Sequence, residues 1–325
     1  MLRVVIAGAG RGHKTEAAIG RAAEELGHRV RLVDVAAWTR RLGSLALPAL
    51  TRRISAFEPD AVVLTRHAIR LGEAPLRALL RGRFSAFWYF DLRIPPLPDV
   101  VRLGRLVDVM YTTCLPEVET YRSAGVPRVL YLPQAMDPWS DRPAERIGGR
   151  YRCDVAFIGN GHHRRRADVL QAVSAVAEVQ IRGPGWEWAR GTLPVAGGAI
   201  YGRRYAEAVG GAAISIGVNA LAEMATLTGT TSNRMWKVMG CGGFFLGEWV
   251  DGMDAFARDG EHCAWYRTRA EAVEQVRRYL ADPAARARIA DAGRRHALAE
   301  HTYRHRVELL LGGRGWTGDR RHTTS

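Results

Sequence analysis

The sequence predicts an α/β protein made of two similar halves, each built on a parallel sheet. Short apolar runs alternate with helix-length segments through residues 1–135, and the same alternation restarts at residue 151. Strands that alternate with helices require right-handed crossovers, which produce a parallel sheet. The chain has 325 residues, enough for two domains that each bury a core. We therefore expect two Rossmann-like domains.

The first half begins with a strand at residues 4–7, a glycine turn, and a helix at about residues 15–26 that stops at Gly27. The further strands expected in this half are residues 29–35, 61–65, 87–90, 109–112 and 129–132. Residues 1–135 are therefore the predicted N-terminal domain. Residues 136–150 are rich in proline, glycine and polar side chains, which is typical of an interdomain linker.

The strands expected in the second half are residues 155–158, 179–182, 214–218, 244–246 and 263–266. Two helices follow them. Thr268 and Glu271 form a capping box at the first, and Asp282 caps the second with Pro283 at its first position. The predicted C-terminal domain spans residues 151–311. Residues 312–325, polar and glycine-containing, are expected to be a flexible tail.

The composition fits a globular intracellular protein, with 47% apolar and 25% charged residues. No run of about 18 uncharged apolar residues is present, and the start of the chain does not resemble a signal peptide. The four cysteines lie far apart, so we expect reduced thiols, no zinc site and a cytoplasmic location. The net charge of +14 favours anionic partners. Because no RNA-binding signature, zinc finger or helix-turn-helix accompanies it, we do not expect nucleic-acid binding.

The first glycine turn leaves two interpretations open. Gly10 and Gly12 belong to a run in which His13 replaces the third glycine of a dinucleotide-binding fingerprint, while Asp34 lies where a ribose-binding acid is expected. Alternatively, the turn presents His13 as a general base for an acceptor hydroxyl. Asp91, at the end of a strand in the same sheet, would orient this imidazole. A structural His13 and a capping Asp91 are the simpler alternative.

A second glycine loop, at Gly159 and Asn160, leads into a helix, where unpaired N–H groups and the helix dipole favour a phosphate. Charge-assisted donors are expected there from Arg164 or Arg166, with a solvated basic surface as the alternative. The pair Arg182 and Gly183, after the next strand, is expected beside the base or ribose of a nucleotide.

The helix predicted from residue 233 carries the strongest signal. Ser232 or Asn233 caps it, and Arg234 and Lys237 lie three residues apart on one face. This pair can hold a diphosphate and stabilise the charge that grows on it as it leaves. Lys237 is one of only two lysines in the chain. Glu248, just past a strand, either binds sugar hydroxyls or is an ordinary surface acid.

Residues 154–311 resemble the CgeB-like (spore maturation protein) family, with its group 1-type C-terminal domain. The resemblance rests on three runs: Ser-Asn-Arg-x-x-Lys-x-x-Gly-Cys-Gly-Gly at 232–243, Asp-Gly-Glu-His at 259–262 and His-Thr-Tyr-x-x-Arg at 301–306. It implies the GT-B fold, with two Rossmann-like domains facing across a cleft, and a metal-independent, nucleotide-sugar-dependent transferase. Group 1-type relatives carry two glutamates where this chain has Gly229 and Lys237, whereas His13 resembles the base of inverting enzymes.

The residues and the resemblance together predict a hexosyl-type glycosyltransferase that moves a sugar from a nucleotide diphosphate to an acceptor hydroxyl. The acceptor would be a small natural product or a cell-envelope glycan, with no metal or cofactor. His13, Asp91 and Lys237 are the predicted catalytic residues. A lipid-linked acceptor would add a peripheral membrane contact. The alternatives are an NAD(P)-dependent oxidoreductase and a basic module for nucleic acid or anionic lipid.

Overall fold

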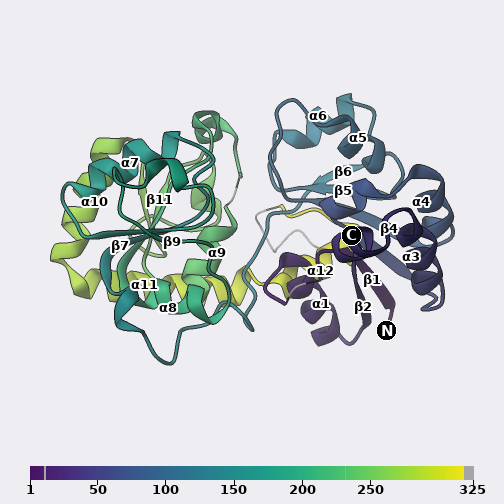
Figure 1. Cartoon of the computed structure of the whole chain (residues 1–325), viewed down its shortest axis with the longest axis horizontal. Coiled ribbons are helices and arrows are strands. Elements are labelled where there is room, and N and C mark those ends of the chain that lie inside the picture. The colour runs from purple at the N-terminus through teal and green to yellow at the C-terminus, as the bar shows by residue number, and fades with distance from the viewer. Residues whose placement is uncertain (11, 231, 318–325) are drawn as a thin grey trace. The chain divides into compact units, whose positions relative to one another are not determined.

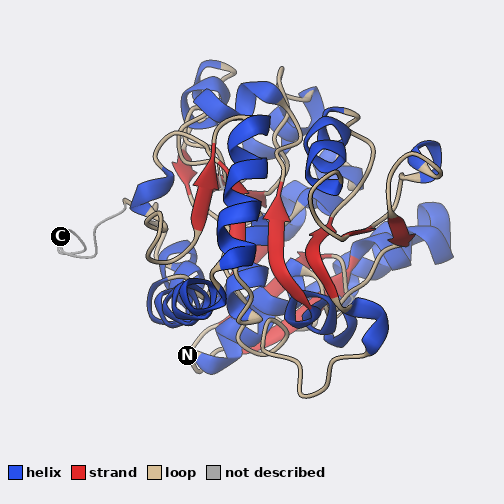
Figure 2. Ribbon diagram, turned by 90° about the vertical axis from the view of Figure 1, so that its left-hand side faces the viewer, coloured by secondary structure: helices blue, strands red, loops and turns tan. Residues whose placement is uncertain are grey.

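The computed structural model describes residues 1–317 apart from residues 11 and 231. The chain divides into two compact units. Unit 1 contains Met1–Gln134 and the segment that starts at Tyr303, and unit 2 contains Ala135–Thr302 (Figure 1). Within the described residues each unit holds one six-stranded sheet in which neighbouring strands run parallel. Figure 2 shows the strands flanked by helices.

The sheet of unit 1 has the strand order β2-β1-β3-β4-β5-β6. Its strands are β1 (Arg3–Gly8), β2 (Arg29–Asp34), β3 (Ala61–Leu64), β4 (Phe84–Tyr89), β5 (Val109–Thr112) and β6 (Val129–Tyr131). Strands β3 and β5 are buried along their whole length. Both faces of a parallel sheet are covered by helices, which is why these strands are continuous apolar runs.

The helices of unit 1 follow these strands. They are α1 (Thr15–Glu25), α2 (Val35–Leu42), α3 (Ala46–Ser55), α4 (Glu73–Leu80), α5 (Pro98–Gly104), α6 (Glu117–Ser123) and α12 (Tyr303–Leu311), with short 3-10 turns η1 (Gly43–Leu45) and η2 (Arg66–Arg70). Asp34 fixes the start of α2, because its carboxylate accepts a 2.8 Å hydrogen bond from Ala37 N.

The sheet of unit 2 has the strand order β12-β11-β10-β7-β8-β9. Its strands are β7 (Cys153–Ile158), β8 (Val179–Arg182), β9 (Val195–Gly197), β10 (Ala212–Gly217), β11 (Phe245–Glu248) and β12 (Ala264–Tyr266). The short edge strand β9 was not predicted from the sequence. The reason is that three residues with only partial burial carry no apolar pattern.

The helices of unit 2 are α7 (Arg165–Ser174), α8 (Arg203–Gly211), α9 (Asn233–Gly240), α10 (Arg269–Ala281) and α11 (Pro283–Glu300), with 3-10 turns η3 (Gly149–Tyr151), η4 (Glu187–Ala189), η5 (Ala222–Thr226) and η6 (Met253–Ala255). Both predicted caps are confirmed. Thr268 accepts a hydrogen bond from Glu271 N at 3.1 Å, and Asp282 accepts one from Ala285 N at 2.9 Å.

Helix α12 belongs to unit 1, whereas the sequence analysis assigned residues up to 311 to the C-terminal domain. Its buried residues pack on the core of unit 1: the Tyr303 ring lies 6.1 Å from that of Trp88, and Leu310 O accepts a hydrogen bond from Tyr111 Oη at 3.2 Å. An amphipathic pattern shows that a helix has a buried face, but not which core receives it. The chain therefore returns to its first unit.

The structure also differs from the predicted linker and tail. Residues 136–150 are part of unit 2, where Asp141 is buried and Met136 N donates a 2.9 Å hydrogen bond to His301 O. In the predicted tail, Trp316 N donates to Tyr131 O at 2.8 Å and the two rings pack together. Residues 318–325 lie outside the described residues. Polar sequence thus forms ordered loops at residues 136–150 and in the described part of the predicted tail.

The four cysteines, Cys114, Cys153, Cys241 and Cys263, form no disulfide among the described residues. None of the helices in the described part of the chain is both long and apolar enough to cross a membrane.

Candidate functional site

The carboxyl edge of the unit 2 sheet brings together most of the predicted donor-binding residues. Strand β7 lies between β10 and β8, and Ile158 is in register with Arg182. The loops that follow these strands therefore emerge side by side, with helix α9 beginning next to them. Ligands of open parallel sheets bind at this edge.

Close glycine packing joins the loops after β7 and β8. A Cβ atom at Gly183, where φ is +151°, would lie 1.9 Å from Gly159 O. A Cβ atom at Gly159 would lie 2.3 Å from the Arg234 guanidinium. A side chain at Gly183 would separate the two loops, and one at Gly159 would displace the Arg234 guanidinium. The predicted residues Gly159 and Gly183 are thus adjacent, and the adjacency requires glycine.

Arg234 joins the start of α9 to the end of β7. Its Nε donates a 2.9 Å hydrogen bond to Ile158 O, and its guanidinium lies 4.5 Å from the centroid of the Phe157 ring. Ser232 caps the helix by accepting a hydrogen bond from Arg234 N at 3.3 Å. Burial lowers the pKa of Arg234. A half-buried cation beside a glycine loop is an electrostatic match for a phosphate.

Arg166 is buried and holds the loop in place. Its Nη1 donates to Asn160 O at 2.8 Å and to Asn160 Oδ1 at 2.9 Å, while its Nε donates to Val218 O at 3.2 Å. Burial, together with the nearby positive charge of Arg234, lowers the pKa of Arg166 to about 9. These hydrogen-bond donors of Arg166 are therefore occupied by groups of the protein, whereas the sequence analysis expected them to contact the ligand.

Glu248 is buried and paired with Arg165, a residue that the sequence analysis did not select. Arg165 Nη1 donates to Glu248 Oε2 at 2.9 Å, and Nη2 makes a second, shorter bond to Oε1. Asn219 N donates to Glu248 Oε2 at 2.8 Å. The alternative of an ordinary surface acid is therefore wrong. Arg164, Arg165 and Arg166 are consecutive in the sequence. Only their spacing around the helix could have suggested that Arg165 faces this edge.

A small pocket beside Glu248 is lined by both polar and apolar side chains. The polar residues are Asn219, Thr230, Ser232, Arg234 and Glu248. Two of their buried atoms, Asn219 Nδ2 and Thr230 Oγ1, have no hydrogen-bond partner among the described residues. Buried polar atoms are ordinarily paired. These donors and acceptors suit a ligand that carries hydroxyl groups.

Lys237 lies one turn further along α9 and forms an ion pair with Asp141. The distance from Lys237 Nζ to Asp141 Oδ1 is 2.7 Å, and the ammonium lies 5.7 Å from the centroid of the Tyr205 ring. Asp141 belongs to the segment predicted as a linker, so the sequence analysis gave it no role. The predicted diphosphate contact of Lys237 stays a prediction.

Three other predicted donor residues have different surroundings. Arg164 directly precedes Arg165 in the sequence, and its guanidinium lies 4.7 Å from the centroid of the Trp188 ring. Arg182 donates to Ala196 O and Arg150 O, both at 3.1 Å, so it fastens β8 to its neighbours. Asn233 Oδ1 is buried without a partner within the protein. Arg164 and Arg182 are thus engaged by the protein, and Asn233 retains a free acceptor.

The acceptor-side residues lie at the carboxyl edge of the unit 1 sheet. A Cβ atom at Gly10 would lie 2.6 Å from Asp34 Cβ, which requires glycine there, whereas Gly12 has open space around it. His13 follows in the same loop and is half-buried. Asp91 forms an ion pair with Arg66, with Arg66 Nη1 and Asp91 Oδ2 2.8 Å apart. The predicted support of His13 by Asp91 stays a prediction.

His67, near the end of β3, is a second imidazole in unit 1 that the sequence analysis missed. It lies in the turn η2, and burial lowers its pKa while the Glu16 carboxylate acts in the opposite direction. Glu16 is itself buried and accepts a 2.8 Å hydrogen bond from Thr65 Oγ1. No sequence motif surrounds His67, so only the sheet order could have placed it close to this edge.

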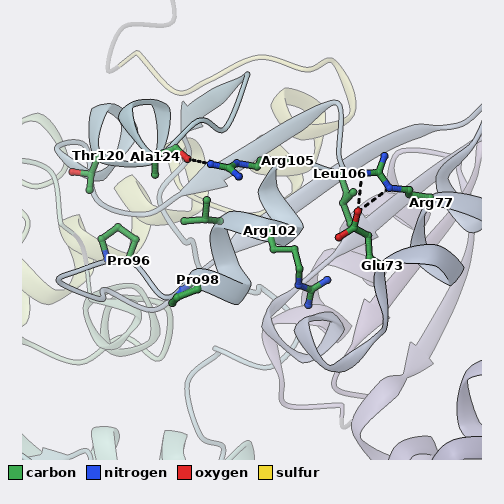
Figure 3. Close-up of a pocket in the computed structure, with 10 residues that line it drawn as sticks. Glu73, Arg77, Pro96, Pro98, Arg102, Arg105, Leu106, Thr120 and Ala124 are labelled. Atoms are coloured by element: carbon green, nitrogen blue, oxygen red, sulfur yellow. Dashed lines mark hydrogen bonds and ion pairs between the residues drawn. The ribbon is translucent and has the colours of Figure 1, made fainter.

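A separate hollow of about 590 Å³ lies on unit 1 among helices α4, α5 and α6 (Figure 3). Its arginines are engaged by the protein: Arg77 pairs with Glu73, and Arg105 bonds to the carbonyl oxygen of Ala124. None of the predicted site residues lines it. We therefore assign the candidate site to the two carboxyl edges.

The sequence comparison agrees with the position of this site. Residues 164–312, which include α7, α9 and β11, match the family described as glycosyl transferase-like. This part of the chain is therefore similar to a glycosyl transferase-like domain. The match supports the predicted glycosyltransferase over the oxidoreductase and the basic binding module. No curated protein sequence matches the chain significantly.

Solved structures resemble this chain over nearly its whole length. Sucrose-phosphate synthase from Thermosynechococcus elongatus has a TM-score of 0.68 at 13% identity, covering 96% of this chain and 98% of that one. Anabaena HepE in complex with UDP-glucose has a TM-score of 0.67 at 11% identity, with coverages of 96% and 99%. T4 phage BGT in complex with UDP-glucose has a TM-score of 0.59 at 10% identity, with coverages of 96% and 98%. These similarities confirm the predicted GT-B fold class.

Proposed function

We propose that the protein transfers a hexosyl group from a nucleoside diphosphate sugar, with UDP as the favoured nucleotide, to an acceptor hydroxyl. The observation that carries the proposal is the convergence of Gly159, Gly183 and Arg234 at one edge of the unit 2 sheet. The similar structures of HepE and T4 phage BGT are complexes with UDP-glucose, which supports the choice of UDP.

In this proposal the donor occupies the unit 2 edge in two parts. Its diphosphate lies against the Gly159 loop and the Arg234 guanidinium. Its sugar lies against the pocket, where Asn219 Nδ2 and Thr230 Oγ1 bind hydroxyl groups. Glu248 accepts from a further hydroxyl while Arg165 holds its carboxylate in place. Asn233 Oδ1 is a further acceptor at the start of α9.

Lys237 acts on the leaving group. When the bond between the sugar and the diphosphate breaks, negative charge increases on the diphosphate, and a fixed cation stabilises that charge. In the protein without donor, Asp141 neutralises the Lys237 ammonium across 2.7 Å. We propose that the ammonium exchanges this partner for the diphosphate, with Asp141 keeping it close to the site.

The acceptor binds at the unit 1 edge, beside Gly10 and Gly12. Its hydroxyl oxygen attacks the anomeric carbon, its proton passes to His13, and the nucleoside diphosphate departs. A neutral imidazole is suited to this step because its ordinary pKa lies close to working pH. Asp91 stabilises the imidazolium that results. No metal is required in this scheme, because arginine and lysine side chains neutralise the diphosphate.

We also propose a family, a cellular location and an acceptor class for the protein. We place the chain in the CgeB-like family on the three sequence runs, and in the cytoplasm on its four free thiols. The acceptor is a small natural product or a cell-envelope glycan, and nucleic acid is not a partner. Peripheral contact with a membrane follows if that acceptor is lipid-linked.

Calorimetric titration of UDP into the wild type and into Arg234→Gln tests the proposal. Removal of a charge-assisted contact costs about 2 kcal/mol, so the variant should bind UDP about 30-fold more weakly. Arg277→Gln, at an exposed position on α10, is the matched control and should bind as the wild type does. Equal UDP affinity in all three proteins would contradict the proposed site.

A further inference from the structure

The outer face of helices α2 and α3 in unit 1 combines positive charge with exposed apolar side chains. A shallow hollow of about 630 Å³ lies there. The hollow is lined by residues that include Arg31, Trp38, Leu45, Pro48, Arg52 and Arg53. These residues, together with the exposed Arg40, Arg41 and Leu42 at the end of α2, are called the α2–α3 surface. The hollow is separate from both carboxyl-edge sites, since none of the predicted site residues lines it.

The positive charge of the α2–α3 surface is not neutralised by the protein. Residues 35–55 contain four arginines and neither aspartate nor glutamate. Arg31 donates only to the backbone, at Arg53 O, 3.1 Å away, and the Arg53 guanidinium lies 5.9 Å from the Trp38 ring centroid. Arg40, Arg41 and Arg52 are exposed and have no carboxylate partner among the described residues. An anionic partner is needed to complement this charge.

Apolar side chains extend from the same face into solvent. The Leu45 side chain, in the turn between the two helices, is 69% exposed, and Leu42 is 40% exposed. Trp38 lies beside the guanidinium of Arg53. Arginine beside tryptophan and exposed leucine is the composition of a surface that rests at a lipid interface. A nucleic-acid backbone would pair with the arginines but would leave the leucines in water.

We propose that the α2–α3 surface docks the protein on an anionic phospholipid membrane. The guanidinium groups bind lipid phosphates, while Leu42 and Leu45 insert between the headgroups. Helix α2 begins at Asp34, which also packs against Gly10 of the acceptor-side loop. Docking therefore brings the acceptor-side edge to the membrane, a consequence that rests on the proposed function. Membrane binding itself does not depend on it.

Vesicle flotation tests the docking directly, without any activity measurement. Full-length protein is mixed at about 0.1 M salt with one of two kinds of vesicle. The neutral vesicles contain phosphatidylcholine alone, and the anionic vesicles contain phosphatidylcholine with about 30% phosphatidylglycerol. The wild type should float with the anionic vesicles and stay behind with the neutral ones. The triple variant Arg40→Ser/Arg41→Ser/Arg52→Ser should bind the anionic vesicles about 100-fold more weakly. Leu45→Ser should bind them about tenfold more weakly.

The control variant removes the same charge from unit 2. Arg269, Arg277 and Arg288 are exposed on α10 and α11, and their triple replacement by serine should leave vesicle binding unchanged. Circular dichroism and melting curves verify that all variants fold. Equal binding to neutral and anionic vesicles, or an equal loss in both triple variants, would overturn the proposal. Tighter binding to a DNA or RNA oligonucleotide than to vesicles, unaffected by Leu45→Ser, would assign the surface to nucleic acid instead.

Discussion

Arg234 Nε donates a 2.9 Å hydrogen bond to the carbonyl oxygen of Ile158, which joins the start of helix α9 to the end of strand β7. The two residues are 76 positions apart in sequence. Because this hydrogen bond and the Phe157 ring hold the half-buried guanidinium, its positive charge remains close to the glycine loop. This single contact places a fixed cation where the donor diphosphate is proposed to bind.

Gly183→Ala is expected to damage both the fold and the donor site. The new Cβ atom would lie 1.9 Å from Gly159 O, at a φ of +151° that side chains rarely adopt. Backbone strain of this kind costs about 1–3 kcal/mol before the loops separate. Urea unfolding should show this loss, and UDP titration should show weaker binding. Gly198→Ala, which meets no atom within 4 Å, is the control. Wild-type stability and affinity in Gly183→Ala would show that the loops do not need to touch.

Glu248→Ala is expected to destabilise unit 2, because it leaves the Arg165 guanidinium without its carboxylate and Asn219 N without its acceptor. Loss of one partner from a largely buried pair costs about 3 kcal/mol. Urea unfolding measures this loss, and Glu274→Ala on the exposed face of α10 is the control. The conservative variant Glu248→Gln should keep most of the stability yet bind the donor sugar more weakly. Equal donor affinity in Glu248→Gln and wild type would remove Glu248 from the sugar site.

Lys237 and Asp141 allow the role of the lysine to be separated from its contribution to stability. Lys237→Met leaves the buried Asp141 carboxylate unpaired and should destabilise the protein by about 2 kcal/mol. Adding Asp141→Asn removes that charge and should restore the stability. Transfer should remain lost in the double variant, because the leaving diphosphate still lacks its cation. Recovery of transfer together with stability would show that Lys237 only supports the fold.

The stability of unit 2 should depend on pH through His262. This imidazole stacks on His296 with ring centroids 4.1 Å apart, and burial, reinforced by His296, lowers the pKa of His262. The unfolded chain then binds a proton more readily than the folded one, so stability falls as the pH drops below about 6.5. His262→Gln should reduce the loss of stability between pH 7 and pH 5.5, measured by urea unfolding. An unchanged pH profile would contradict this linkage. His162→Gln, at an exposed position, is the control.

Local sequence pattern predicted the elements well but not their long-range partners. Continuous apolar runs such as β3 and β5 indicated parallel strands, and the caps at Thr268 and Asp282 fixed two helices. These features depend on residues close in sequence. The Arg165–Glu248 pair spans 83 positions and the Lys237–Asp141 pair spans 96. No periodicity records a contact at such a separation.

The absence of long-range contacts from the sequence pattern also explains why the domain of helix α12 and the partners of Arg166 were not predicted. Helix α12 has a clear buried face, yet that face belongs to unit 1, since Tyr303 and Leu310 pack there. Arg166 carries a charge that suits a phosphate, yet its donors hold Asn160. The chemistry of a side chain indicates which ligands it can bind. Only the fold decides whether groups of the protein itself already occupy its hydrogen-bond donors.

The proposed transfer requires the carboxyl edge of the unit 2 sheet to bind a nucleoside diphosphate. Thermal unfolding with UDP, GDP, TDP, ADP, NAD and NADP, each at about 100 times an expected dissociation constant, tests it most directly. A bound ligand at that concentration adds about 2.7 kcal/mol to the free energy of unfolding, which shifts the melting temperature by several degrees. The account predicts a shift with UDP that Arg234→Gln abolishes. A shift with NAD or NADP alone, or none with any nucleoside diphosphate, would contradict it.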